Sequence, residues 1–547
     1  MDITLQSVAS VSLERRHPCL PLLEQSQVGT AACTPRGVRL HHRLAGQWLQ
    51  FINTRSSATL AVAAFLLTVA VMFMYRPFSQ AESGDSAVYD YIAQSIVRGQ
   101  VPYRDEIEIK APGSFYLSAL AMEAGRAFGV RDIIATRLLH ILFAGLLSAV
   151  VYLVGEAYLR NRFAALLAVL SLLISQHFAL WTVGGGQPKL PMILFGMLSL
   201  LLIAKNRPFL AGFCSMLSCL CWQPGLLFTG VAFLVFSRYL TTWRDLRALK
   251  VLAGSAIPLT ALVLYFRSIG ALGELWTWTV VFNYSIYSRI ALKGEDNPFG
   301  HMLNVVLKVY RVDIVLLVLS LIGFISFAGQ RLRERLRGVS ALKSSDLFRD
   351  AIVIAPLMYF AAGFIRFNAG PYVIPFVPFI GIFFGWAIIE VVRLVKKREL
   401  LVTTLDWAPS VVLVLLLGIA AYRGIANRFE SILTLQDQDK RFEPISSMLG
   451  ASDTIYVHGT TEILVLLNKP NLNPYISIEA GKDDYVAAQR YGGSFAALVD
   501  EIEASAPKIV ALSRLQRVGH GDALRGLVEQ NYDQLDWPGY DVYVRKQ

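Results

Sequence analysis

Long apolar runs recur along this chain and constrain its fold more than any other feature. A helix needs roughly 20 apolar residues to cross the ~30 Å hydrocarbon core of a bilayer. Such segments are predicted at 57–75, 133–156, 164–183, 190–204, 208–223, 225–240, 251–267, 308–328, 350–366, 371–394 and 405–423. Charged residues make up only 17% of the 547 residues, whereas about a quarter is usual for a soluble domain. The sequence therefore predicts a polytopic α-helical membrane protein with about eleven transmembrane helices, although the division of the short runs between 190 and 240 stays open.

Basic residues cluster in alternate connections between these segments. The clusters are Arg160 and Arg162; Lys205 and Arg207; Arg238, Arg244, Arg247 and Lys250; Arg331, Arg333, Arg335, Arg337, Lys343 and Arg349; and Arg393, Lys396, Lys397 and Arg398. With an odd number of spans, every cluster falls on one side, which the positive-inside rule assigns to the cytoplasm. Membrane lipids therefore account for the net charge of +11. Nucleic acid is not an expected partner, because the chain lacks a basic platform with interleaved aromatic residues.

The composition divides the chain into three parts. Residues 1–56 are polar and rich in arginine, which indicates a disordered cytoplasmic tail, with an organellar transit peptide as the alternative. Residues 57–425 form the transmembrane domain, whose first segment acts as an uncleaved signal anchor. Residues 426–547 have mixed charges, strand-like runs (Thr454–Val457, Lys508–Ala511, Tyr540–Val544) and helical runs (Phe495–Ala504, Asp522–Glu529). They are expected to form a small extracytoplasmic α/β domain.

Cysteine spacing does not support a metal site. Cys19 and Cys33 lie in the tail, and Cys214, Cys219 and Cys221 lie in an apolar segment. The Cys219/Cys221 pair has no second Cys or His pair with matching spacing. The sequence therefore gives no basis for assigning a metal ligand or a cofactor.

The first outer loop, residues 76–131, carries most of the candidate chemistry. Asp85 follows the first span by ten residues, so it is expected at the membrane surface, and residues 86–97 have helical spacing. Capping of that helix is the alternative role for Asp85. Prolines and glycines in 98–113 predict a defined turn, followed by a second helix at 114–128. Near a bilayer, a carboxylate can take a proton from an acceptor hydroxyl while a lysine stabilises a departing lipid phosphate.

The string GDSAVYDYIAQSIVRGQVPYRDEIEIKAPGSFYLSAL resembles the first outer loop of GT-C glycosyltransferases, with RgtA/ArnT-like and protein-mannosyltransferase-like enzymes as the nearest branch. The resemblance implies that Asp85 is the catalytic or acceptor-orienting acid and that Lys110 holds the donor phosphate. It implies supporting roles for Asp90, Tyr103, Arg104 and Asp105. The chain has Glu108-Ile-Lys-Ala-Pro where that branch has Glu-Lys-Pro-Pro, so the part played by Glu108 stays open. In the second outer loop Gln187 stands where the family often has another acid, which weakens the case for a divalent metal.

Later segments carry further candidates. Arg366 and Tyr372 lie in an Arg…Tyr…Pro…Pro segment similar to one that GT-C enzymes have at an outer membrane boundary. Arg366 is either a second phosphate ligand or a snorkelling arginine at a helix end. Trp222-Gln223-Pro224 is either a polar site element or a simple turn. The aromatic loop 269–301 is either an interfacial belt or a lid over the site.

These expectations combine into one function and one alternative. The first is an inverting hexosyl- or pentosyltransferase that moves a sugar from a polyprenyl-phosphate donor to a lipid, glycan or protein acceptor, outside a bacterial inner membrane. A nucleotide-sugar donor is disfavoured because the site faces away from the cytoplasm. The alternative is a transporter or flippase for a lipid-linked glycan, which would place ionisable residues within the spans.

Overall fold

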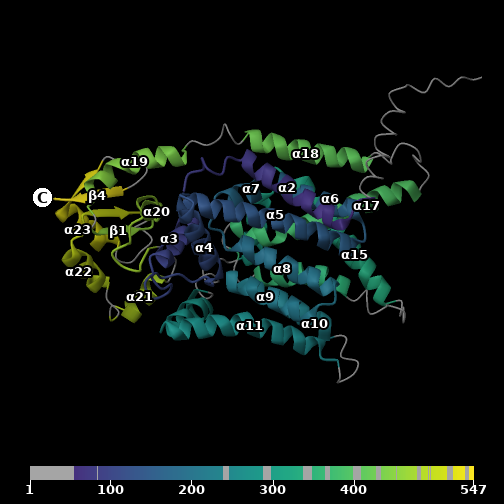
Figure 1. The fold of residues 1–547 in the computed structure, drawn as a ribbon, viewed down its shortest axis with the longest axis horizontal. Helices are drawn as coiled ribbons and strands as arrows, with labels where there is room; N and C mark the ends of the chain where they lie inside the picture. The colour runs from purple at the N-terminus through teal and green to yellow at the C-terminus, as the bar shows by residue number, and fades with distance from the viewer. Residues whose placement is uncertain are drawn as a thin grey trace, which may run out of the picture.

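The computed structural model describes most of the chain after the N-terminal tail. The described residues are 54–82, 84–237, 245–287, 297–336, 348–363, 367, 370–397, 408–426, 433–450, 453–476, 482–490, 492, 495–513, 521–535, 537 and 541–546. They form an elongated helical bundle with a small α/β domain at one end (Figure 1).

Apolar helices of spanning length dominate the bundle. Five stretches are long and apolar enough to cross a membrane: α2 (Ser57–Met74), α5 (Asp132–Leu159), α11 (Arg247–Ser268), α15 (Ile314–Leu336), and Gly370–Val395, which combines η4 (Gly370–Phe376) with most of α17 (Val377–Lys397). A bent pair, α6 (Arg162–Ile174) and α7 (Gln176–Val183), makes six if it is one span. The multi-span helical class is therefore confirmed, while the figure of about eleven spans stays a prediction.

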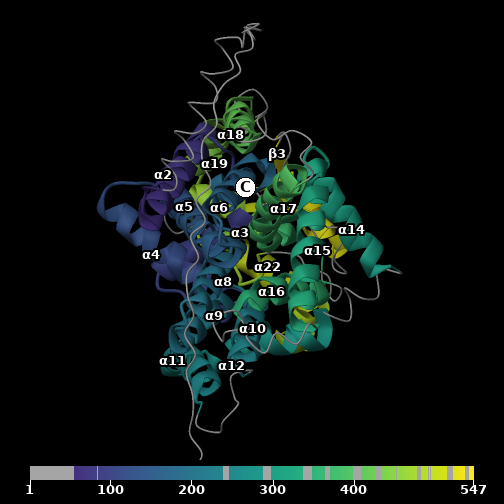
Figure 2. The same ribbon diagram turned by 90° about the vertical axis from the view of Figure 1, so that its right-hand side faces the viewer.

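Shorter helices occupy the remaining predicted segments. They are α8 (Lys189–Ala204), α9 (Pro208–Cys221), η1 (Gln223–Gly225), α10 (Leu226–Ser237), α16 (Ala351–Gly363) and α18 (Ala408–Ala426). Figure 2 looks along the bundle and shows α8 in its interior, between α2 on one side and α15 on the other. Leu66, Val315 and Ile325 of the outer helices are exposed. Exposed apolar side chains of this kind match a surface that faces lipid.

Two predicted spans differ from the observed helices. The prediction at 308–328 is wrong in its bounds, because α14 (Pro298–Val309) ends in a polar break before α15 begins. Asp313 in that break makes an ion pair with Arg423 at 2.7 Å. The prediction at 164–183 is broken at Ser175, whose extended backbone bends the pair α6 and α7 by 67°.

Glycines let α9 and α11 approach closely. A Cβ atom on Gly212 would lie 2.0 Å from the carbonyl oxygen of Val251, and one on Gly254 would lie 2.0 Å from that of Phe209. Small residues at a crossing allow backbone contact, which is a main source of helix association in membranes. This packing fixes α11 against the helices that surround the candidate site.

The first outer loop folds into two helices, as predicted. α3 (Gly84–Val97) and α4 (Gly113–Ala127) are joined by a turn-rich segment in which Tyr103 adopts a left-handed φ of 72°. The predicted loop 269–301 contains a short helix, α12 (Leu272–Trp276), followed by the π-helix η2 (Thr277–Tyr287).

The C-terminal α/β domain contains a four-stranded sheet of order β1-β2-β4-β3. β1 and β2 are parallel and the other pairs antiparallel. The elements are α19 (Leu435–Met448), β1 (Ile455–His458), α20 (Glu462–Leu467), α21 (Lys482–Arg490), α22 (Phe495–Ser505), β2 (Ile509–Leu512), α23 (Gly521–Asn531), β3 (Tyr532–Leu535) and β4 (Asp541–Arg545). The three predicted strands are confirmed, whereas β3 was missed because Tyr532–Leu535 lacks apolar alternation: Tyr532 is buried, but two exposed polar residues follow it. The domain lies beside α3, at the same end of the bundle as the first outer loop (Figure 1).

Candidate functional site

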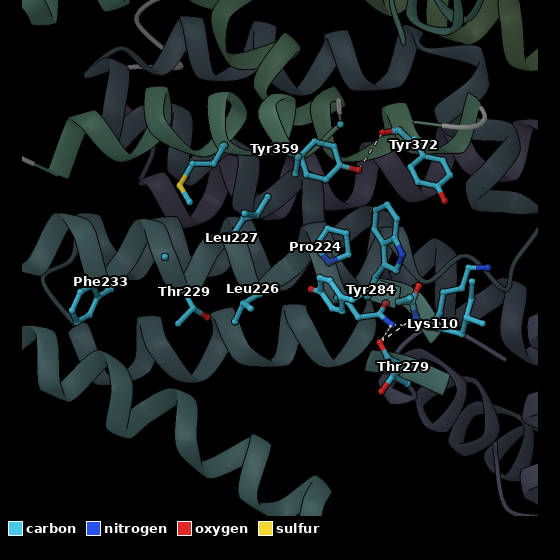
Figure 3. Close-up of a pocket in the computed structure, with 18 of the residues that line it drawn as sticks. Lys110, Pro224, Leu226, Leu227, Thr229, Phe233, Thr279, Tyr284, Tyr359 and Tyr372 are labelled. Carbon is cyan, nitrogen blue, oxygen red and sulfur yellow. Dashed lines mark hydrogen bonds between the residues drawn. The ribbon is translucent and has the colours of Figure 1, made fainter. Parts of the chain in front are cut away.

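A cavity of about 580 Å³ extends between the bundle helices and the first outer loop. We call it the inter-helix cavity. Its lining residues are Ile109, Lys110, Trp222, Gln223, Pro224, Leu226, Leu227, Thr229, Gly230, Phe233, Leu252, Thr279, Asn283, Tyr284, Met358, Tyr359, Ala362, Gly363 and Tyr372. Figure 3 shows that Lys110 and Tyr372 lie at one end and Phe233 at the other. Among these lining residues Lys110 alone is charged at neutral pH, so the cavity is an apolar passage with a cation at one end.

Three contacts fix Lys110. Its Nζ lies 3.2 Å from Glu108 Oε1 and 5.6 Å from the centre of the Tyr89 ring. The Tyr103 hydroxyl donates a 2.6 Å hydrogen bond to the main-chain carbonyl of Lys110. The residue expected to hold a donor phosphate is therefore presented to the cavity in a defined orientation.

The contacts of Glu108 give this residue a structural role. Its Oε1 accepts hydrogen bonds from the main-chain N–H of Ile109 at 2.8 Å and of Lys110 at 3.2 Å. Only 2% of its side chain is exposed, and the same oxygen faces the Lys110 ammonium. Glu108 thus holds both the backbone and the side chain of the loop segment that carries the lysine.

Two amides that the sequence reasoning did not assign anchor this segment to the bundle. Gln223 Nε2 and Asn283 Nδ2 each donate a 2.7 Å hydrogen bond to the carbonyl of Ile109. Gln223 belongs to the Trp-Gln-Pro motif for which a polar site element was one of two interpretations. Asn283 lies in η2, where nothing in the sequence distinguished it from its aromatic neighbours.

Asp85 lies in the first turn of α3 and is exposed. It makes no hydrogen bond with the described residues and does not line the inter-helix cavity. It precedes Tyr89 by one helical turn, so it is on the face of α3 that Lys110 contacts through the Tyr89 ring. The Ser86 hydroxyl donates to Gly185 O at 3.0 Å and fixes the start of this helix.

Asp90 is buried on another face of α3. Its Oδ2 accepts a 3.0 Å hydrogen bond from the Thr136 hydroxyl, and burial raises its pKa well above the usual aspartate value. The neighbouring Glu82 is also buried, and desolvation raises its pKa to about 7 even though Arg137 opposes the shift. These groups support the base of α3 and lie away from solvent.

Arg137 is a buried charged residue at the base of the first outer loop that the sequence reasoning missed. It is fully buried, donates to Pro77 O at 2.9 Å and Gln80 O at 2.7 Å, and pairs with Glu82 at 2.9 Å. The sequence feature that could have identified it is its position inside the apolar segment 133–156, where a charged residue is unusual. An arginine buried there ties the exit of the first span to α5.

The remaining loop candidates face water. Arg104 pairs with Asp105 at 3.2 Å, and Asp105 Oδ2 accepts from the Val101 N–H at 2.7 Å. Arg104 lies outside the inter-helix cavity, on the opposite side of the loop.

The second outer loop contributes a buried lysine rather than an acid. Gln187 is buried, and its Oε1 finds no donor among the described residues. Lys189 is 1% exposed, and its Nζ lies 5.1 Å from the Trp222 ring and 5.2 Å from the Tyr372 ring, both of which line the cavity. Cation–π contacts of this kind offset part of the cost of burying an ammonium. Lys189 was missed although it immediately precedes an apolar segment.

Arg366 lies outside the described residues.

No group of three or more His, Cys, Asp or Glu side chains within the described ranges is arranged to hold a metal ion. His458, at the end of β1, stacks between Tyr456 and Tyr475 with ring centres 6.2 and 5.3 Å away. It is a core residue of the C-terminal domain.

Comparison with solved structures identifies proteins that share the fold of this chain. No known family and no curated protein matches the sequence. The solved structure of ArnT from Cupriavidus metallidurans bound to undecaprenyl phosphate matches with a TM-score of 0.56 at 12% identity, covering 89% of this chain and 98% of that one. The apo structure of the same protein matches with a TM-score of 0.51 at 13% identity and the same coverage. The resemblance inferred from the first outer loop is thus confirmed at the level of structure, and the chain has the fold of the GT-C protein ArnT along most of its length.

Proposed function

We propose that this protein transfers a sugar from a polyprenyl-phosphate donor to an acceptor at the outer face of a bacterial inner membrane. The observation that carries the proposal is the inter-helix cavity, an apolar passage that ends at Lys110 beneath the first outer loop. A polyprenyl phosphate has the same division into a long apolar chain and one anionic head. The fold supports the proposal, because the matching ArnT structure is bound to undecaprenyl phosphate.

The donor would lie along the cavity. Its isoprenoid chain would contact Leu226, Leu227 and Phe233, and its phosphate would face Lys110. Lys189, behind the rings of Trp222 and Tyr372, adds positive potential at the same end. Arg366 is a further proposed phosphate ligand. An ammonium stabilises a leaving phosphate more strongly in a site that contains little water than in bulk water, because the electrostatic attraction is less screened.

Asp85 is the proposed base. Its carboxylate takes the proton from an acceptor hydroxyl, and the hydroxyl oxygen forms a bond to the anomeric carbon of the donor sugar. The bond between that carbon and the phosphate oxygen breaks on the opposite face, so the configuration inverts. The electron pair leaves with polyprenyl phosphate, whose charge Lys110 stabilises. Asp90, Arg104 and Asp105 support the loop during this step.

The test compares wild type with Asp85→Asn in membranes supplied with extracted polyprenyl-phosphate sugars. Mass spectrometry follows the transferred sugar, and Glu123→Gln, an exposed site on α4, is the matched control. We expect transfer by wild type and the control and its loss in Asp85→Asn at equal expression. Equal transfer by Asp85→Asn removes Asp85 from the mechanism. No transfer by wild type with any donor favours the transporter or flippase.

A further inference from the structure

A second cavity lies on the other side of the loop segment that carries Lys110. It has a volume of about 370 Å³ and we call it the loop cleft. Its lining residues are Tyr103, Arg104, Ile107, Gly273, Glu274, Thr277, Trp278, Val486 and Gln489. They come from the first outer loop, from α12 and η2, and from α21 of the C-terminal domain. A cavity of this size is sufficient for a small ligand or for part of a larger one.

The loop cleft and the inter-helix cavity share their walls. Tyr103 and Ile107 line the cleft while Ile109 and Lys110 line the inter-helix cavity. In η2, Trp278 faces the cleft and Thr279 faces the cavity. The partition between the two spaces is therefore one layer of loop and one layer of helix.

The two spaces differ in chemistry. The inter-helix cavity is apolar apart from its lysine, whereas the cleft has a guanidinium, a carboxylate, an amide and a hydroxyl from Arg104, Glu274, Gln489 and Thr277. Glu274 is close enough to Arg104 to interact with it electrostatically. Arg104 also pairs with Asp105 at 3.2 Å, so its positive charge is compensated within the protein. Such a lining favours a neutral ligand with many hydroxyl groups over a phosphate.

Aromatic and solvent-exposed groups add to this chemistry. Trp278 and Tyr103 form the buried apolar wall, while 44% of the Arg104 side chain is exposed and Gln489 is also exposed. Sugar rings have apolar C–H faces as well as hydroxyl edges, so an aromatic wall beside planar polar groups matches both. The cleft thus opens towards water, whereas a donor lipid would come from the membrane.

The C-terminal domain completes the cleft. α21 supplies Gln489, and Lys482 at its start donates a 3.0 Å hydrogen bond to the carbonyl of Ile107. The N–H of Ile107 in turn donates to Pro474 O at 3.0 Å. Both polar groups of one loop residue are therefore held by the domain. The domain thus fixes the backbone of the loop segment between the cleft and the inter-helix cavity.

We infer that the loop cleft binds a carbohydrate, namely the part of the acceptor that lies beyond the hydroxyl that reacts. The inference rests on the proposed function, and it specifies the acceptor as a glycan or a glycosylated molecule. Arg104, Glu274 and Gln489 contact its hydroxyl groups, and the C-terminal domain contributes to acceptor selection.

The experiment measures sugar binding directly in the full-length protein in detergent. Saturation-transfer NMR is recorded with maltose and N,N′-diacetylchitobiose as neutral probes and with glucose 6-phosphate as an anionic probe. The variants are Glu274→Gln and Gln489→Ala, both at half-buried or exposed positions that leave the core intact, and Glu123→Gln is the control. Binding of undecaprenyl phosphate is measured on the same samples by native mass spectrometry.

We expect at least one neutral disaccharide to bind wild type and the control. Its affinity should fall about tenfold in each cleft variant, as expected for loss of about 1.4 kcal/mol, while undecaprenyl phosphate binding is unchanged. The inference is overturned if neither disaccharide binds wild type, if the cleft variants bind as well as wild type, or if only the phosphorylated sugar binds. Sugar binding without binding of undecaprenyl phosphate would retain the cleft and reject the proposed donor.

Discussion

The hydroxyl of Tyr103 donates a 2.6 Å hydrogen bond to the main-chain carbonyl of Lys110, across the turn that joins α3 and α4. Tyr103 reaches this position with a φ of 72°, a conformation that non-glycine residues rarely adopt. A buried tyrosine in strained backbone thus fixes the lysine at the end of the inter-helix cavity. Strain of this kind persists only where surrounding contacts hold it.

Tyr103→Phe tests this contact. The change keeps the ring and removes one hydrogen bond, whose loss costs about 1 kcal/mol. We expect the transfer rate to fall roughly fivefold with little change in melting temperature. Tyr116→Phe on α4, which removes the hydroxyl contact to Tyr265 at 3.2 Å, is the control. Equal rates for Tyr103→Phe and wild type would show that the hydroxyl does not position Lys110.

Lys110→Met removes the cation and keeps most of the side-chain volume. A hydrogen bond to a charged group contributes about 1.5–3 kcal/mol, so undecaprenyl phosphate should bind roughly 10- to 100-fold more weakly. Lys110→Arg should retain most of the affinity, because the charge remains. Native mass spectrometry of detergent-solubilised protein measures both. Unchanged affinity in Lys110→Met would place the phosphate elsewhere.

Gly186→Ala should displace the helix that carries Asp85. A Cβ atom at position 186 would lie 2.8 Å from Ser86 O and 3.0 Å from its Cα, and Gly186 has a φ of 59°. Gly129→Ala is the matched control, because Gly129 has a φ of 69° but no atom within 4 Å of the added Cβ. Left-handed backbone costs both variants about 1–2 kcal/mol, so both should melt at a lower temperature. Only Gly186→Ala should also lose transfer, and loss of transfer in both would contradict this account.

Glu106 predicts a pH dependence of stability. Burial raises its pKa from 4.5 to about 8, although Ser95 donates a hydrogen bond to it at 3.2 Å. The folded protein therefore holds the proton more tightly than the unfolded chain does. The contribution of protonated Glu106 to the free energy of unfolding is fully present below pH 4.5 and is lost as pH rises through about 8. The melting temperature of wild type should fall across this window relative to that of Glu106→Gln, which is neutral at every pH. If the melting temperatures of wild type and Glu106→Gln changed in parallel from pH 5 to 9, Glu106 would not be the cause of this pH dependence.

The sequence alone determined the structural class of the protein, a multi-span helical bundle with a small C-terminal α/β domain. Most predicted apolar segments contain a helix, because hydropathy over about 20 residues depends only on neighbours in the chain; 164–183 is broken at Ser175 and 308–328 is displaced from α15. Helical spacing and the prolines and glycines of residues 86–128 were sufficient to predict two helices around a structured turn, and the resemblance of this loop to that of GT-C enzymes agrees with the ArnT-like fold.

Tertiary structure decided how the site is assembled. Gln223 and Asn283 meet the carbonyl of Ile109 from 114 and 174 residues away, and Lys482 meets that of Ile107 from 375 residues away. Lys189 and Arg137 are ordinary basic residues until folding buries them, the first between aromatic rings and the second among loop carbonyls. Local periodicity carries no information about such pairings, because they form only when packing brings distant segments together and leaves buried polar groups to be satisfied.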